Sequence, residues 1–214
     1  MTIKTFQVNP LGENCYVIND DTGQAAIIDC GCSTESEWSE INKHIAKNNL
    51  EVVHLLNTHL HFDHVWGNAF VYRDLGLKAE ASPLDKSIYE NIDNQIKAVA
   101  GVFLPHPPMP PLGEKLQEGS NIAIGNTILR VLHTPGHSQG SLCFYAEADK
   151  TLFSGDTLFQ CSYGRTDLEG GSMTQMMSSL RRLASLPDEV KVFPGHGPST
   201  DIHSEKMYNP YLPM

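Results

Sequence analysis

The sequence predicts an α/β protein of two similar halves, in which each half forms a sheet and the two sheets pack against each other. Strand patterns followed by helix patterns occur twice, first through residue 80 and again from about residue 120 to the end. A length of 214 residues favours one large domain over two small ones. We therefore expect residues 1–214 to form a single domain.

The first half begins with a strand meander whose apolar runs are separated by turns rich in Gly, Asn and Asp. Thr34 and Glu37 match the S/T-x-x-E pattern of a helix N-terminus, and Trp38, Ile41 and Ile45 follow at helical spacing. The predicted elements of this half are strands at 5–8, 15–18 and 25–28, a helix from about 34 to 48, a strand at 52–56, a helix at 65–75 and a strand at 78–81.

An insertion is predicted at about 83–118, between the two halves. A helix from about 83 to 102 has apolar residues on one face. The proline-rich run at 105–111 that follows can be neither helix nor central strand. We interpret it as an inserted loop that could lie over a functional site as a lid.

The second half repeats the order of strands and then helix. A helix begins at Ser172, which is a suitable N-cap, and carries an apolar stripe that we assign to core packing. The predicted elements of this half are strands at 127–132, 141–145 and 151–153, a helix from 172, and a strand at 190–193.

The composition excludes several classes of function. Lys and Arg number 15 against 25 Asp and Glu, so the net charge of −10 argues against a nucleic-acid partner. No apolar run approaches the roughly 18 residues of a membrane span, and the first ten residues have no apolar signal region. Five scattered cysteines include no C-x-x-C pair. We therefore expect a cytoplasmic protein with no membrane partner and with reduced thiols; Cys30-Gly31-Cys32 could bind a metal, but burial in the core is the favoured interpretation.

A cluster of metal-binding residue types directly follows the apolar strand at 52–56. It contains His59, His61, Asp63 and His64, at the carboxyl end of the strand, where α/β proteins usually build their sites. His59 and His61 are two residues apart in extended backbone, so they point to the same side and can hold one metal. Asp63 and His64 come where the chain turns towards helix and can hold a second.

Three further candidates also follow strands, each beside a glycine that permits close backbone approach. They are His137 in Thr134-Pro135-Gly136-His137, Asp156 in Ser154-Gly155-Asp156-Thr157, and His196 in Pro194-Gly195-His196-Gly197. Single residues of this kind are weak evidence, but three of them behind apolar strands can converge on one face of a sheet sandwich.

With these motifs in place, the chain resembles the metallo-β-lactamase superfamily and, within it, the compact bacterial branch of glyoxalase-II-like (hydroxyacylglutathione hydrolase-like) proteins. The H-x-H-x-D-H loop with its three partners is specific for the superfamily, and the stretch from Ser154 to Asp167 narrows the match. The remaining matching segments are Glu13-Asn14-Cys15-Tyr16, Asp29, Gly164-Arg165-Thr166-Asp167 and Asn209-Pro210-Tyr211-Leu212.

The resemblance implies a four-layer αββα sandwich with two divalent metal ions at one edge. His59, His61 and His137 would hold the first metal, Asp63, His64 and His196 the second, and Asp156 would bridge them. Imidazole and carboxylate ligands without thiolate suit zinc, although iron or manganese would also fit. Asp29 would fix the ligand loop by hydrogen bonds; the alternative is a plain turn residue.

The resemblance also implies hydrolysis of a small-molecule thiolester, such as a hydroxyacylglutathione, by attack of a metal-bridging hydroxide. Asp63 and Asp156 are the catalytic candidates, with Asp63 accepting the proton. Arg165 would contact a substrate carboxylate or amide; the alternative is a surface ion pair with Asp167. Larger glyoxalase II enzymes carry a C-terminal helical domain that grips glutathione, but only 18 residues follow His196 here. The glutathione assignment is therefore open.

Other functions share this pattern. A persulfide dioxygenase of the same fold uses one iron held by the equivalents of His59, His137 and Asp156. A lactone or ester hydrolase is a further alternative, and a metal-binding scaffold without activity is the non-enzymatic one. The oligomeric state is not indicated.

Overall fold

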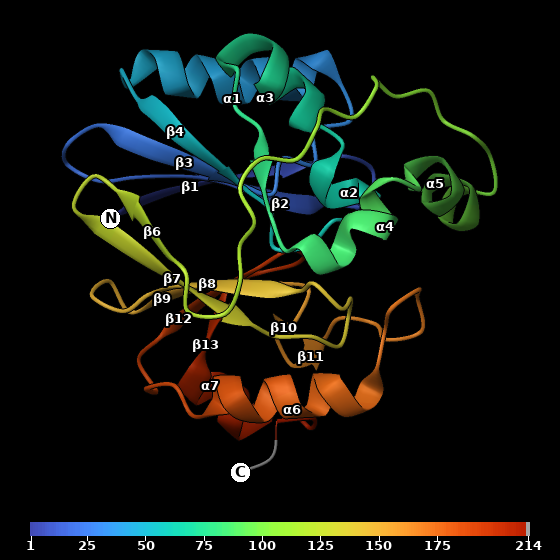
Figure 1. The fold of residues 1–214 in the computed structure, drawn as a ribbon. Coiled ribbons are helices and arrows are strands. Elements are labelled where there is room, and N and C mark those ends of the chain that lie inside the picture. Colours follow the sequence, from blue (N-terminus) through green and yellow to red (C-terminus); the bar gives the residue numbers. More distant parts are fainter. Residues whose placement is uncertain (213–214) are drawn as a thin grey trace.

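Two mixed sheets pack face to face in the computed structural model, which describes residues 1–212 (Figure 1). The first sheet contains, in hydrogen-bonded order, β1 (Thr2–Val8), β2 (Glu13–Asn19), β3 (Gln24–Ile28), β4 (Glu51–Leu56) and β5 (Ala79–Glu80). The second contains β13 (Thr200–Asp201), β12 (Lys191–Pro194), β9 (Thr151–Gly155), β8 (Leu142–Ala146), β7 (Thr127–His133) and β6 (Asn121–Ile124).

Both halves follow the same plan, an antiparallel meander and then a helical crossover to a parallel strand. In the first half, β1 to β3 are antiparallel neighbours, and helix α1 (Glu35–Lys47) leads to β4, which is parallel to β3. In the second half, β6 to β9 form the meander, and helix α6 (Met173–Ala184) leads to β12, which is parallel to β9. The prediction of two similar α/β halves is confirmed.

Helices cover both outer faces, which completes an αββα sandwich (Figure 1). Helices α1 and α3 (Asn68–Leu75) pack on the first sheet, and α6 and α7 (Ile202–Tyr208) pack on the second. Along β2, Tyr16 and Ile18 belong to the core between the sheets, whereas Cys15 and Val17 face the helices. The central strands are thus buried on both faces, which explains why their sequences are continuous apolar runs.

The segment predicted as one helix at 65–75 is two helices, α2 (Phe62–Val65) and α3, separated at Trp66 and Gly67. Gly67 packs directly on the chain at Cys30 and Cys32: a Cβ at this position would lie 2.7 Å from Cys30 Sγ. Helical structure therefore starts earlier than the apolar periodicity suggests. It is interrupted at Gly67, where the backbone contacts the chain that follows β3.

The single helix predicted at 83–102 is also wrong. The structure has a 3-10 turn η1 (Pro83–Asp85), then α4 (Lys86–Tyr89), and then α5 (Ile92–Ala100), which ends at Gly101 with φ of 72°. Asp85 leaves helical geometry (φ −96°, ψ 10°), and its side chain bonds to residues of the second half. Asn91 (φ −120°, ψ 29°) makes the second break.

Several short elements were not predicted: β6, β13, helix α7, and the hairpin of β10 (Leu158–Phe159) and β11 (Ser162–Tyr163). Most are too short to show a periodicity, and β6 is an edge strand with alternate residues exposed. Within residues 1–212, no helix is long and apolar enough to cross a membrane.

Phe153 tests the packing between the sheets. Its buried ring lies 5.3 Å from the Tyr16 ring and 5.5 Å from the Phe193 ring. We expect Phe153→Ala to lower the free energy of unfolding by about 3–5 kcal/mol because it leaves a cavity. Urea denaturation would measure this, with Ile128→Ala, at an exposed position, as a control that costs less than about 1 kcal/mol. Equal losses in the two variants would contradict a core role for Phe153.

Candidate metal centre

The sequence-predicted site residues converge at one edge of the sandwich, where strands of both sheets end. The loop after β4 and the start of α2 contribute the H-x-H-x-D-H residues, and the ends of β7, β9 and β12 contribute one residue each. The residues brought together are His59, His61, Asp63, His64, His137, Asp156 and His196.

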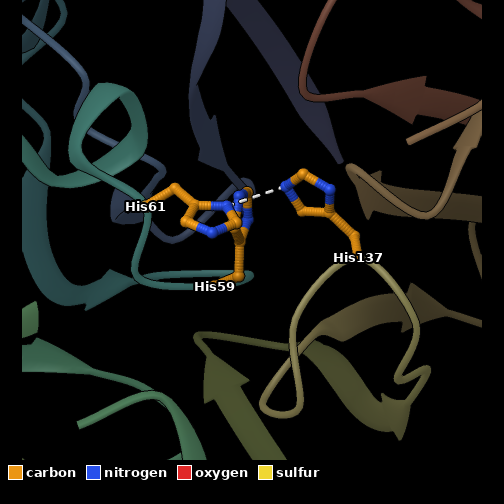
Figure 2. A group of neighbouring side chains, drawn as sticks. All are labelled: His59, His61 and His137. Atoms are coloured by element: carbon orange, nitrogen blue, oxygen red, sulfur yellow. Dashed lines mark hydrogen bonds between the residues drawn. The ribbon is translucent and has the colours of Figure 1, made fainter. Parts of the chain in front are cut away.

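His59, His61 and His137 form the first group, with ring nitrogens within 4.8 Å of one another. Figure 2 shows the three rings gathered together, His59 and His61 from the first half and His137 from the second. The Nδ1 atom of His61 lies 2.8 Å from Nε2 of His137. All three side chains are buried, so water does not separate them from one another.

Hydrogen bonds on the far side of two rings fix which nitrogen faces the group. His137 Nδ1 donates to the carbonyl of Arg165 at 2.7 Å, and a carbonyl can only accept. His59 Nδ1 donates to Thr58 Oγ1 at 3.1 Å, because the Thr58 hydroxyl proton is itself given to Asp29. The Nε2 atoms of His59 and His137 are therefore the ones that face the group.

Asp63, His64 and His196 form the second group. His196 Nε2 lies 3.2 Å from Asp63 Oδ2 and 3.3 Å from His64 Nε2. Asp156 lies between the two groups: its Oδ2 is 3.5 Å from His137 Nε2, and its Oδ1 is 3.5 Å from His64 Nε2. One carboxylate therefore faces both groups at once.

Burial and mutual charge shift the pKa values of these residues. Burial lowers the pKa of His61 to about 3 and that of His59 well below its ordinary value, so both rings are neutral at pH 7. Burial opposes charge on Asp156, but the positive charge of the neighbouring His64 outweighs it and lowers the pKa of this carboxyl. Against the effect of burial, the carboxylates of Asp156 and Asp63 in turn raise the pKa of His64. The neutral imidazoles of His59 and His61 and the ionised carboxylate of Asp156 are states that coordinate a cation.

Among the buried side-chain atoms of residues 1–212 that make no hydrogen bond, two belong to these groups, His59 Nε2 and Asp156 Oδ1. Orphaned acceptors at such positions are costly unless a cation or water is bound. The donor set is imidazole and carboxylate without thiolate, because Cys30 and Cys32 lie in the apolar cluster under α1. These clusters suggest divalent metals, and their chemistry accommodates zinc, iron or manganese.

Asp29 holds the histidine loop. The residue has a left-handed backbone with φ of 51°, and its carboxylate accepts from Thr58 N at 2.8 Å and from Thr58 Oγ1 at 2.6 Å. It also lies 3.1 Å from His64 Nδ1, so Nε2 of that ring is left for the second group. Although Asp29, His59 and His64 are close enough to share an ion, the oxygens of Asp29 are already occupied. Asp29 is thus a positioning residue, as predicted.

The Glu13-Asn14-Cys15-Tyr16 segment positions the loop that carries His196. Asn14 Nδ2 donates to the carbonyls of Pro194 and Gly197, and Tyr16 OH donates to Pro194 O at 2.6 Å. Gly195 permits this approach because a Cβ there would overlap the carboxylate of Asp156 and the ring of His64.

Sequence analysis missed Asp85, Asn57 and Asn68. Asp85 is fully buried and accepts from Leu60 N, Ser138 Oγ and Gly140 N, so it joins the two loops that carry the first histidine group. Burial raises its pKa. Asn68 donates to Asn57, which donates to the carbonyl of His64. Only Asn57 lies next to a recognisable motif, so sequence spacing offers no signal for the other two.

The Arg165 guanidinium forms the surface ion pair that was the alternative prediction. Its Nε and Nη2 each donate to Asp167 at 2.7 Å, and both side chains are exposed. Its carbonyl orients His137, and the residue also lines the pocket beside the metal groups. Arg165 thus touches the site through its backbone, while its side chain is available only at the rim.

A cavity of about 500 Å³ opens beside the two groups and is bordered by His61, Asp63, His137, Asp156 and His196. Its outer wall comes from α4 and α5 of the insertion. The proline-rich run does not form a lid here: His106 and the prolines at 110 and 111 line a separate cavity on the other side of these helices. The prediction that the proline-rich run lies over the site is therefore wrong; α4 and α5 of the insertion border the cavity instead.

Known proteins share the sequence and the fold of this chain. Residues 8–196 match the family model for the metallo-beta-lactamase superfamily. The chain is 33% identical to hydroxyacylglutathione hydrolase GloC of Haemophilus influenzae, over 99% of this chain and 98% of GloC. It is similar to the crystal structure of TTHA1623 in a di-iron-bound form (38% identity, TM-score 0.85, 98% and 100% of the two chains). It is also similar to the BLEG-1 B3 metallo-beta-lactamase (31%, TM-score 0.88, 100% of both).

Asp29→Asn tests the positioning role of this carboxylate. The amide keeps the shape but removes charge and one acceptor, so we expect metal affinity to fall by about 10- to 100-fold. Competition with a chromophoric chelator would measure it, and circular dichroism would establish that the variant is folded. Asp21→Asn, in an exposed turn, is the matched control and should bind metal as the parent does. An unchanged affinity in Asp29→Asn would refute the role.

Proposed function

Because this chain belongs to the metallo-β-lactamase superfamily, we propose that it is a metal-dependent hydrolase that cleaves a small-molecule thiolester. The observation that carries the proposal is the complete set of donors around Asp156, with a group of three on each side and an open cavity above. The leaving group of a thiolester is a thiolate, which needs little help from a proton donor. This matches a site in which nearly all acidic and basic side chains already interact with one another.

His59, His61 and His137 would hold one ion, and Asp63, His64 and His196 a second, with Asp156 shared. When divalent ions are bound, the chemistry they supply is a polarised substrate carbonyl and a water whose pKa falls from 15.7 to about 7. The residues of the chain supply geometry: the rings of His59, His64 and His137 are held from behind by Thr58, Asp29 and a carbonyl, so these rings need little reorganisation in the reaction.

Asp63 is the proposed proton acceptor, because its side chain borders the cavity while Oδ2 contacts His196. In the reaction, a C–O bond forms from water to the acyl carbon and the C–S bond breaks. The thiolate leaves without a strong general acid, since the pKa of a thiol is about 8.5. The products are a carboxylate and a thiol, with no change in oxidation state.

A relative supports this proposal. The Haemophilus influenzae protein is a hydroxyacylglutathione hydrolase, and it matches this chain along almost its whole length. The lactone or ester hydrolase alternative uses the same donors and differs only in its leaving group. The persulfide dioxygenase alternative needs a single iron on His59, His137 and Asp156, and it leaves the second group without a task.

Metal content separates these functions first. We expect close to two metal ions per chain by plasma mass spectrometry, and loss of thiolester hydrolysis after chelation, restored by added metal. We expect two ions because each of the two groups offers carboxylate or imidazole donors for one ion. A single iron that persists after zinc supplementation would overturn the hydrolase proposal, and oxygen uptake with glutathione persulfide would then be measured.

His196→Ala gives a second, independent test. His196 belongs only to the second group, so we expect kcat/KM for thiolester hydrolysis to fall about 100-fold or more, through loss of several kcal/mol of metal-derived stabilisation. The control is His203→Ala, an exposed histidine beside Asp188. If His196→Ala retained full activity with one metal bound, the second group would have no catalytic role.

A further inference from the structure

The cavity beside the metal groups has a mainly apolar wall. It is about 500 Å³, large enough for an acyl group and part of its carrier. The wall is made by the insertion on one side and by the loops after β1 and β11 on the other. Its apolar residues are Leu11, Phe62, Ile88, Ala98, Val99, Phe159 and Leu168.

Cationic side chains are nearly lacking in this wall. Among the lining residues, the only Lys or Arg is Arg165, and its guanidinium already makes two hydrogen bonds to Asp167. Glu169, which is exposed, lines the same cavity. A carrier with free carboxylates would therefore meet Glu169 and a neutralised arginine, which is an unfavourable electrostatic match.

Three carboxamides lie in the wall instead, those of Asn91, Asn94 and Gln95. Asn91 and Asn94 are three residues apart at the start of α5, so they share one face, and Asn94 Nδ2 donates to Asn91 Oδ1. Within residues 1–212, the other amide atoms of this pair, Asn91 Nδ2 and Asn94 Oδ1, take part in no hydrogen bond. The pair thus offers one donor and one acceptor, which is the complement of a secondary amide.

Gln95 fixes this pair relative to the metal groups. Its Oε1 accepts from Phe62 N, one residue after His61, and its Nε2 donates to the carbonyl of Ile88. Ile92 and Ile96 of the same helix pack in a cluster with Phe62 and Trp66 of the histidine loop. Asn94 is therefore held by a helix that packs on the residues after His61, and Asn91 lies at the N-terminus of this helix.

From this wall we infer that the thiol carrier is an uncharged, amide-bearing chain of the N-acylcysteamine type, as in a pantetheine arm, and not an anionic peptide such as glutathione. The inference rests on the proposed thiolester hydrolysis. The amide N–H of the carrier donates to Asn94 Oδ1, and its carbonyl accepts from Asn91 Nδ2. Hydrolysis breaks the acyl C–S bond, forms a C–O bond from water, and releases a carboxylic acid and the neutral-chain thiol.

The direct test compares two thiolesters with the same acyl group, S-lactoylpantetheine and S-lactoylglutathione, on the metal-loaded protein. We expect kcat/KM to be at least about tenfold higher for S-lactoylpantetheine. If S-lactoylglutathione were equal or better, the carrier inference would be overturned while thiolester hydrolysis stood. If neither were cleaved by protein of full metal content, the proposed function would fail and the inference with it.

Variants of the amide pair separate a specific contact from a structural role. We expect Asn94→Ala and Asn91→Ala each to raise KM for S-lactoylpantetheine by about three- to tenfold with kcat unchanged, because the amide contact is made equally before and during the reaction. KM for S-lactoylglutathione should not change. The matched control is Asn121→Ala, at an exposed position of β6. Equal shifts for both substrates, or no shift for either, would refute the contact.

Discussion

The buried carboxylate of Asp29 is the interaction on which the metal centre depends most. It takes hydrogen bonds from the backbone and hydroxyl of Thr58 and lies against His64. Through Thr58 it also orients His59, so one carboxylate sets a ring in each donor group. A buried charge of this kind is stable only when its acceptors are filled, and the end of β3 must therefore stay in register with the end of β4. The strained backbone at Asp29 is consistent with this requirement.

The sandwich brings the two halves of the centre together. The first sheet carries His59 and His61, and the second carries His137, Asp156 and His196 at the ends of three strands. The first donor group therefore needs both sheets, because His59 and His61 come from one and His137 from the other. The core between the sheets fixes their separation, and bonds from Asn14 and Tyr16 of β2 to Pro194 fix the end of β12. The packing of the core thus fixes the positions of the donors at the edge of the sandwich.

Sequence reasoning found what is encoded locally. The donors are recognisable because they follow apolar strands, either clustered in one H-x-H-x-D-H loop or singly beside a glycine, and strand ends of one sheet meet at one edge. Asp85 was not recognisable, because it bonds to Ser138, 53 residues away. The same bond pulls Asp85 out of helical geometry, which is why the helix predicted at 83–102 breaks there. The guanidinium of Arg165 illustrates a local case: its ion pair with Asp167, two residues away, was the alternative to the predicted substrate contact.

The metal-binding donors and most of the cavity wall belong to different parts of the chain. The donors are held by networks inside the two sheets, whereas much of the apolar wall and the amide pair belong to the insertion. If the proposed thiolester hydrolysis holds, substitutions on the cavity face of α5 change which thiol carrier fits without moving a donor. Asp85 marks the limit of this freedom, because it lies in the insertion but bonds to both histidine loops. Gln95 limits it as well, because its side chain accepts from the backbone of Phe62, one residue after His61.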